Sequence, residues 1–283
     1  MAAAVESRLV GLADREMALQ FLSRDAVANL LLLDLAARLG TPPAPGETPT
    51  KIVAAWRDDE IVGMAGLHPT VVLDANASEE IVEAFIPFIE RIKIGLVKSF
   101  VPTVDLLWRE FSARHARRVI VDRIEVAYAL HEDDLKRIEP IGGESARCAK
   151  DSDLDDLVVA ALESLREEGR PDPFVGDGEG FRYWVRGRVA RARVVESAGR
   201  VAMVGYADVQ RPEGWLLQGI YTWPSCRQRG FASFGVSELC HEAFAAGAKH
   251  VQLAVVEGNT AAQHLYEGLG FRPFAKLRTI LFT

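Results

Sequence analysis

The stretch that decides the fold is Arg227-Gln228-Arg229-Gly230-Phe231-Ala232. Residues 215–222 before it are mostly apolar, several of them β-branched or aromatic, and predict a buried strand. After it, small and apolar residues recur at helical spacing as far as Gly247. A helix that starts here presents unpaired backbone N–H groups and the positive end of its dipole. Because residues 230 and 232 are small, the stretch predicts a turn that binds a diphosphate. An ordinary βα turn with solvated arginines is the alternative.

A second pattern follows at residues 251–271. Residues 251–256 predict a buried strand, 257–260 a turn, and 261–268 a helix that glycine can cap at its end. In this order the two patterns resemble the motifs of the GCN5-related N-acetyltransferases, Q/R-x-x-G-x-G/A and N-x-x-A-x-x-L/F-Y-x-x-x-G-F. The second motif stands here from Asn259 to Phe271. The resemblance implies a mixed α/β fold and acetyl-CoA as the co-substrate.

Length and charge narrow the class of protein. The 283 residues suit one large domain or two ordinary ones, and 49% of them are apolar. A net charge of −7 argues against nucleic acid as a partner. The arginines between 182 and 193 are interpreted as a solvated helix face.

Cysteine usage and the N-terminus predict the compartment. Three cysteines at no metal-ligand spacing predict neither a disulfide framework nor a metal site. The first residues lack a basic and apolar leader, and no apolar run approaches the length of a membrane span. We therefore expect a cytoplasmic protein with no membrane partner.

Internal similarity predicts two tandem domains of the same fold. Residues 52–67 and 192–209 both predict a β-hairpin, and Val-Gly-Met-Ala at 62–65 matches Val-Gly-Tyr-Ala at 204–207, an offset of 142 (205 minus 63). A helix with an aspartate near its start precedes each hairpin, with Asp14 and either Asp151 or Asp153 as equivalent caps. Charge, proline and paired glycines at 131–143 predict the boundary, giving domains 1–140 and 141–283.

The first domain lacks the residues of both motifs. After its hairpin, a helix at 78–91, a strand at 93–97 and a helix at 101–111 are predicted, but no R-x-x-G-x-G/A occurs. Tandem acetyltransferases with one degenerate half are known in the family that the chain resembles. The resemblance therefore implies a degenerate first domain that supports an active second one, completed by a strand at 276–282.

The cofactor contacts are assigned to the second domain. Backbone N–H groups near Gly230 would hold the diphosphate, with charge-assisted help from arginine. The resemblance implies that residues of the preceding strand pair with pantetheine, in a wedge where that strand leaves its neighbour. Pro224 fits this, because proline cannot extend a ladder. The candidate cofactor-binding residues are Ile220, Tyr221, Thr222, Arg227, Gln228, Arg229, Gly230, Phe231, Ala232, Ser233 and Asn259.

The resemblance also assigns Tyr266 as the general acid that protonates the departing thiolate, an effect worth about 10²–10⁴ in rate. A tyrosine packed on Phe271 and Phe274 is the alternative, and Asn259 could cap its helix as well as contact the cofactor. Family members that carry a glutamate on the strand have it where Ala254 stands here. The general base therefore stays unassigned.

The acceptor is expected to be a small-molecule or peptide amine, acetylated by direct attack in a ternary complex. The segment 165–183 mixes acidic and aromatic residues and hints at a cationic amine, although acidic loops are usually only solvated. Two other functions stay open: a non-catalytic acyl-CoA-binding regulator or scaffold, and a transferase with a longer acyl or aminoacyl donor. The chain is expected to be a monomer or a homodimer.

Overall fold

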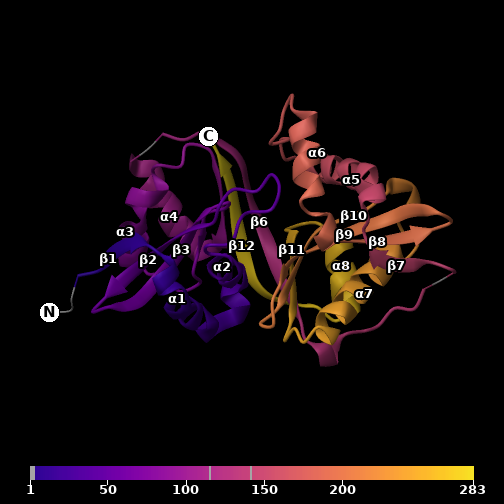
Figure 1. The fold of residues 1–283 in the computed structure, drawn as a ribbon, viewed down its shortest axis with the longest axis horizontal. Helices are drawn as coiled ribbons and strands as arrows, with labels where there is room; N and C mark the ends of the chain where they lie inside the picture. Colours follow the sequence, from indigo (N-terminus) through magenta and orange to yellow (C-terminus); the bar gives the residue numbers. More distant parts are fainter. Residues whose placement is uncertain (1–3, 115, 141) are drawn as a thin grey trace.

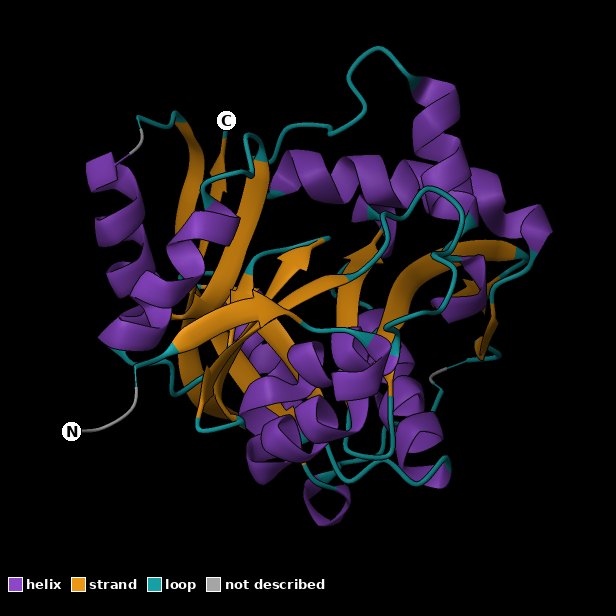
Figure 2. Cartoon of the chain, turned by 60° about the vertical axis from the view of Figure 1, so that its left-hand side comes forward, coloured by secondary structure: helices purple, strands orange, loops and turns teal. Residues whose placement is uncertain are grey.

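A computed structural model describes residues 4–114, 116–140 and 142–283 of the chain. Strands form a curved central layer with helices on both sides (Figure 2). The predicted mixed α/β class is confirmed. The strands form one sheet of four in the order β1-β2-β3-β4 and one sheet of eight in the order β5-β12-β6-β11-β10-β9-β8-β7.

The N-terminal half begins with the four-stranded sheet. The predicted hairpin at 52–67, strand at 93–97 and helices at 78–91 and 101–111 match β2, β3, β5, α3 and α4 to within a few residues. The elements of this half are β1 (Glu6–Leu9), α1 (Arg15–Leu22), α2 (Ala26–Ala37), β2 (Lys51–Arg57), β3 (Glu60–His68), β4 (Val72–Leu73), α3 (Glu79–Ile89), β5 (Gly95–Phe100), α4 (Val101–Arg114) and β6 (Val119–Leu130).

The C-terminal half repeats this order of elements. It contains β7 (Ser145–Cys148), α5 (Leu154–Glu167), α6 (Gly178–Arg186), the 3-10 turn η5 (Val189–Arg191), β8 (Ala192–Ser197), β9 (Arg200–Gln210), β10 (Trp215–Thr222), the 3-10 turn η6 (Pro224–Cys226), α7 (Phe231–Ala245), β11 (Val251–Val256), α8 (Thr260–Leu269) and β12 (Arg272–Phe282). Helices α5 and α6 cover one face of its strands, and α7 and α8 cover the other (Figure 1).

The two halves share a specific ion pair as well as their element order. Arg8 donates to Asp14 at 2.7 Å, and Arg147 donates to Asp153 at 2.7 Å. Both pairs are offset by 139 residues (147 minus 8, 153 minus 14). Asp153 is thus the equivalent of Asp14. Neither carboxylate caps its helix as predicted; each accepts from an amide three residues upstream, on Gly11 or on Lys150.

The last strands of the halves are exchanged. The predicted strand at 276–282 belongs to the sheet that holds the strands of the second half, but β6 of the first half stands between it and β11. Strand β6 of the first half pairs with β11 of the second, from Glu125 opposite Val256 to Leu130 opposite Val251. Strand β12 pairs with β6 and with β5, so both exchanged strands lie at the seam, where the two halves meet (Figure 1). The predicted boundary after residue 140 lies in the connection between β6 and β7, and residue 141 lies outside the described residues.

Exchange places ionised groups at the seam. Glu125 is 2% exposed and accepts from Lys98 of β5, from Arg123 of its own strand and from Thr279 of β12. Burial alone would raise the pKa of Glu125, but Lys98 and Arg123 lower that pKa to about 2. The seam therefore holds a buried carboxylate with cations around it. The first half supplies Glu125, Lys98 and Arg123, and the second half supplies Thr279.

Candidate functional site

Strands β10 and β11 are neighbours over only part of their length. They pair in parallel at Trp215 with Val251 and at Leu216 with Gln252, and at no later position among the described residues. The remainder of β10 still pairs with β9, with Tyr221 opposite Val204. One edge of residues 220–222 is therefore bonded while the other has no strand beside it. This is the wedge that the resemblance implies for pantetheine.

An irregularity marks the point where the strands part. The β10–β9 register shifts between Gln218 and Tyr221, and Gly219 between them has a φ of +56°. Such a bulge bends the strand and turns a peptide group out of the ladder. Sequence reasoning missed it, although a glycine inside an apolar strand was the available signal.

The predicted diphosphate turn lies where the strands part, at the start of α7. Gly230 takes a φ of +83°, which suits glycine and lets the chain enter the helix directly. The described residues supply no hydrogen-bond acceptor for the backbone N–H groups of Gln228, Arg229, Gly230, Phe231, Ala232 and Ser233. These N–H groups and the helix dipole form a site for an anion. Gly230 and Ala232 bring little side-chain bulk to the start of this helix.

Arg227 is already held by an acidic partner. Its Nη2 lies 2.5 Å from Oε1 of Glu167 at the end of α5, and its Nε donates to the Thr222 carbonyl at 3.0 Å. Arg229 is exposed and lies over the Phe231 ring, 5.0 Å from its centroid. The structure thus links the turn to α5 through Glu167, a contact that sequence reasoning did not find.

The equivalent turn of the first half is unsuited to a diphosphate. Helix α3 occupies the place of α7, but its first turn carries Glu79 and Glu80. Asp74, buried before this helix, accepts from the amides of Met64 and Asn76 at 2.8 and 3.1 Å. Carboxylates at this position repel an anion, so the start of α3 does not suit a diphosphate.

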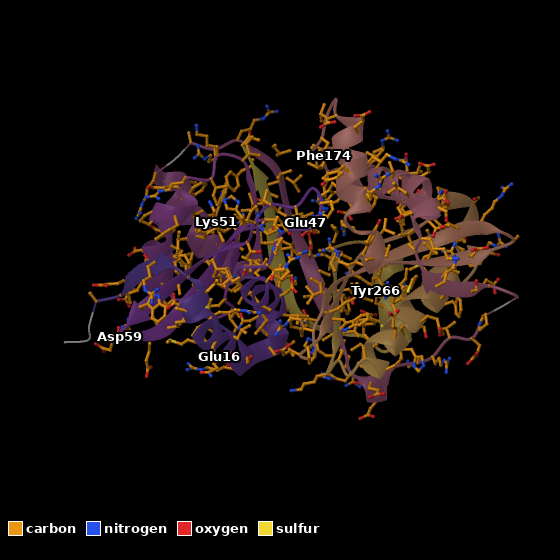
Figure 3. The ribbon with its side chains drawn as sticks, viewed as in Figure 1. Glu16, Glu47, Lys51, Asp59, Phe174 and Tyr266 are labelled. Atoms are coloured by element: carbon orange, nitrogen blue, oxygen red, sulfur yellow. The ribbon has the colours of Figure 1, made fainter. Side chains whose placement is uncertain are left out.

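Tyr266 lies on α8 with its ring against Phe271, at 5.8 Å between centroids (Figure 3). The side chain is buried, and burial raises the pKa of its phenol, so that the hydroxyl stays protonated at neutral pH. No described residue accepts from or donates to this hydroxyl. Tyr266 is therefore a protonated hydroxyl with no hydrogen-bond partner among the described residues.

Asn259 caps α8, with its Oδ1 accepting from the Ala262 amide at 3.2 Å. The capping role left open by the sequence is thus present, and the side-chain NH₂ is left for another partner. Ala254 faces Ala127 across the β11–β6 ladder, so neither residue of this pair carries a carboxylate.

Four titratable residues lie near the motifs in sequence, and three of them contact other groups. Glu257 pairs with Lys276 at 2.7 Å, and Asp208 pairs with Arg188 at 2.6 Å. Burial lowers the pKa of His250 to about 4, and its Nε2 lies 2.7 Å from Nε2 of Gln252. His264 is exposed on α8. The geometry assigns none of these four as the base.

The aromatic residues near β10 have different roles. Trp215 is a core residue, 5% exposed, whereas Trp223 is half-buried with its ring 5.3 Å from that of Tyr221. The arginines at 182, 188, 191 and 193 all pair with carboxylates, so they do not form an unpaired basic surface.

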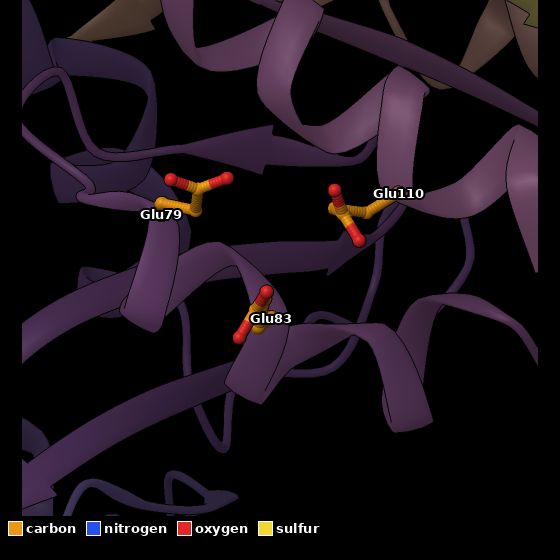
Figure 4. Close-up of side chains that lie close together, drawn as sticks. All are labelled: Glu79, Glu83 and Glu110. Atoms are coloured by element: carbon orange, nitrogen blue, oxygen red, sulfur yellow. The ribbon is translucent and has the colours of Figure 1, made fainter.

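Glu79, Glu83 and Glu110 bring carboxylate oxygens within 4.8 Å of one another on the first half (Figure 4). Arg109 contacts both Glu79 and Glu110, so an arginine already offsets part of the negative charge of this surface cluster. In the part of the chain that the structure describes, no helix is long and apolar enough to cross a membrane.

Comparisons with known proteins find the same fold and a matching family model. The model of the acetyltransferase (GNAT) family matches residues 156–271. No curated protein matches the chain. A Drosophila protein of solved structure has a TM-score of 0.74 at 12% identity, over 97% of this chain and 98% of its own.

Two other solved structures are named as acetyltransferases. A GCN5-related N-acetyltransferase from Sphaerobacter thermophilus has a TM-score of 0.60 at 15% identity, over 98% of this chain and 95% of its own. A tandem GNAT protein from the clavulanic acid biosynthesis pathway has a TM-score of 0.55 at 14% identity, over 98% of each chain. The chain therefore has the tandem GNAT fold throughout, and its C-terminal half carries an acetyltransferase domain of the GNAT family.

Proposed function

We propose that the protein is an acetyl-CoA-dependent N-acetyltransferase whose C-terminal half is active. Acetyl-CoA would supply the acetyl group as a thioester. The observation that carries the proposal is the set of unpaired amides from Gln228 to Ser233 beside the parted strands β10 and β11. A donor set of this kind fits a diphosphate, and the free edge of residues 220–222 fits an extended amide arm.

Residues of the chain account for the binding of acetyl-CoA and for the transfer of one proton. Arg227 and Arg229 add positive charge at the turn, and Asn259 fixes the start of α8. Tyr266 would donate a proton or a hydrogen bond to the leaving sulfur, because its hydroxyl is protonated and no described residue is bonded to it. The acceptor amine attacks directly in a ternary complex with no acyl-enzyme. An amine of pKa about 10.4 is only slightly deprotonated at neutral pH, and water would remove its proton.

A non-catalytic acyl-CoA-binding module is the second candidate, favoured by the absence of a carboxylate at Ala254 and by the engagement of Glu257 and Asp208 in ion pairs. Thermal stabilisation by acetyl-CoA is expected for both candidates. A ligand at 100 times its Kd adds about 2.7 kcal/mol to the free energy of unfolding. Release of free thiol in the presence of amines is expected only for the enzyme.

Tyr266→Phe separates the candidates further. We expect the variant to lose at least about tenfold in kcat, a threshold below the range of about 10²–10⁴ for general-acid effects, with unchanged acetyl-CoA affinity. The ring contact with Phe271 does not involve the hydroxyl, so the fold should be kept. Equal kcat for the variant and the parent protein would remove the acid role from Tyr266.

A further inference from the structure

One exposed polar side chain interrupts the apolar run of β10. Gln218 is exposed, and so is Gly219 after it, whereas Leu217 and Tyr221 on either side are buried. Gln218 lies opposite Tyr206 of β9, and the register of the two strands shifts directly after it. No described residue forms a hydrogen bond with the side-chain amide of Gln218. Gln218 therefore presents an amide group without a partner at the bulge of β10.

Gln218 and Ala254 lie on either side of the place where β10 and β11 part. The last paired residues of the two strands are Leu216 and Gln252, and Gln218 and Ala254 each follow two positions later. Because side chains alternate between the two faces of a strand, Gln218 and Ala254 point to the same face of the sheet. They therefore stand at the closed end of the wedge, with the diphosphate turn at its other end.

The face to which they point is the one that carries α5 and α6. Tyr206, opposite Gln218, packs with these helices. The residues of β11 that point to the other face are buried against α7 and α8, whereas Ala254 and Val256 are only half-buried. Solvent thus reaches the sheet beside the wedge on the α5 face. We call this surface the open face and define it as Gln218, Gly219, Ala254 and Val256.

The open face is uncharged, and the carboxylates on the elements beside it are paired with cations. Glu125 of β6 contacts Lys98 and Arg123. At the end of α5, Glu167 and Glu168 are each held by an arginine, Glu167 at the diphosphate turn and Glu168 over β6. An ammonium group at the open face would therefore lose hydration without gaining a counter-ion. Such desolvation disfavours the charged form, so an amine binds there as the free base.

We propose that the open face binds the acceptor amine uncharged, that Oε1 of Gln218 accepts a hydrogen bond from it, and that the acceptor is an amine partly uncharged at neutral pH, such as an α-amino group. At pH 7 roughly a tenth of α-amino groups of pKa about 7.8 are deprotonated, against fewer than about one in a thousand alkylamines of pKa about 10.4. This substrate class rests on the proposed acetyl transfer.

The reaction balances without a protein base. The nitrogen of the free amine attacks the thioester carbon, a C–N bond forms and the C–S bond breaks. The nitrogen gives its extra proton to water, the sulfur takes a proton from Tyr266, and water returns a proton to Tyr266. Gln218 holds the amine before the attack and carries no proton in these steps.

The test compares alaninamide, which has an α-amino group, with 3-methylbutan-2-amine, an alkylamine of the same shape. At pH 7 and equal total amine, thiol release from acetyl-CoA should be at least about tenfold faster with alaninamide, after subtraction of the uncatalysed reaction. Between pH 7 and 9, the rate with the alkylamine should rise about tenfold per pH unit, as its free base does. The rate with alaninamide should level off above about pH 8.

Gln218→Glu is the matched variant, because it keeps the length of the side chain and places a carboxylate on the open face. It should hold the alkylammonium ion, so the preference for alaninamide should shrink at least tenfold. Gln218→Leu should raise the KM for alaninamide severalfold. Both variants should keep their stabilisation by acetyl-CoA, because Gln218 is exposed and lies at the other end of the wedge from the diphosphate turn.

The comparison of the two amines needs only the parent protein, so it decides the matter even if a variant does not fold. Thiol release at pH 7 that is as fast with the alkylamine as with alaninamide would overturn the inference. No release with alaninamide from a protein that acetyl-CoA stabilises would do the same, as would an unchanged preference in folded Gln218→Glu. Failure of acetyl-CoA to stabilise the parent protein would instead reject the proposed function.

Discussion

Removing Glu167 should tighten the binding of acetyl-CoA. Glu167 holds Arg227 at 2.5 Å, with the two side chains 47% and 42% exposed. For Arg227 to contact a diphosphate, this ion pair must open. An exposed ion pair is worth about 0.2–1 kcal/mol. Glu167→Gln removes this cost and also removes a negative charge near the turn.

The expected gain follows from that range. A change of 0.2–1 kcal/mol corresponds to about 1.4- to 5-fold in Kd, so isothermal titration of acetyl-CoA should show tighter binding by that factor. The gain should shrink at high salt, because both the ion pair and the diphosphate contact are screened. Arg227→Gln should weaken binding in the same assay.

Glu163→Gln is the matched control. Glu163 is on the same helix and pairs with Arg166, not with the turn, so its loss removes an equal charge without freeing Arg227. If Glu167→Gln binds acetyl-CoA no more tightly than the parent protein, or only as tightly as Glu163→Gln, Arg227 does not move from Glu167 to the diphosphate.

Three further outcomes follow from the structure. Ala232→Glu places a negative charge in the first turn of α7, as Glu79 does in α3. Calorimetry should show that acetyl-CoA binding is lost while thermal stability is equal or higher. Retained affinity would place the diphosphate elsewhere. The pKa of Glu125 is lowered in the folded protein to about 2, below its ordinary 4.5. Its contribution to stability is therefore present above pH 4.5 and is lost as pH falls towards 2. Urea unfolding across this window should show the loss of stability, and Glu125→Gln should reduce that pH dependence. Fragments 1–140 and 141–283 should each lack a cooperative thermal transition and regain one when mixed, because β6 and β12 pair across the seam; independent melting of either fragment would contradict the exchanged pairing.

Local features of the site were predictable from the sequence. The turn before α7 follows from a glycine at residue 230 between an apolar run and a helical stripe, which are short-range properties of the chain. The cap at Asn259 also depends only on neighbours within one helical turn. The repeat was detectable because both halves keep the same hairpin pattern.

Partners far apart in the chain were not predictable. A strand such as β12 is compatible with several neighbours, and pairing with β5 and β6 depends on which edges the folded halves leave open. The pairing of Arg227 with Glu167, 60 residues apart, arises in the same way.

The sequence by itself determined that residues 227–233 form a turn with outward amides, because glycine conformation and helix geometry are local. Only the tertiary structure decided that the last strands are exchanged and that β10 and β11 part beside the exposed amide of Gln218. The physical reason is that strand pairing and burial depend on surfaces that distant segments present to each other after they fold.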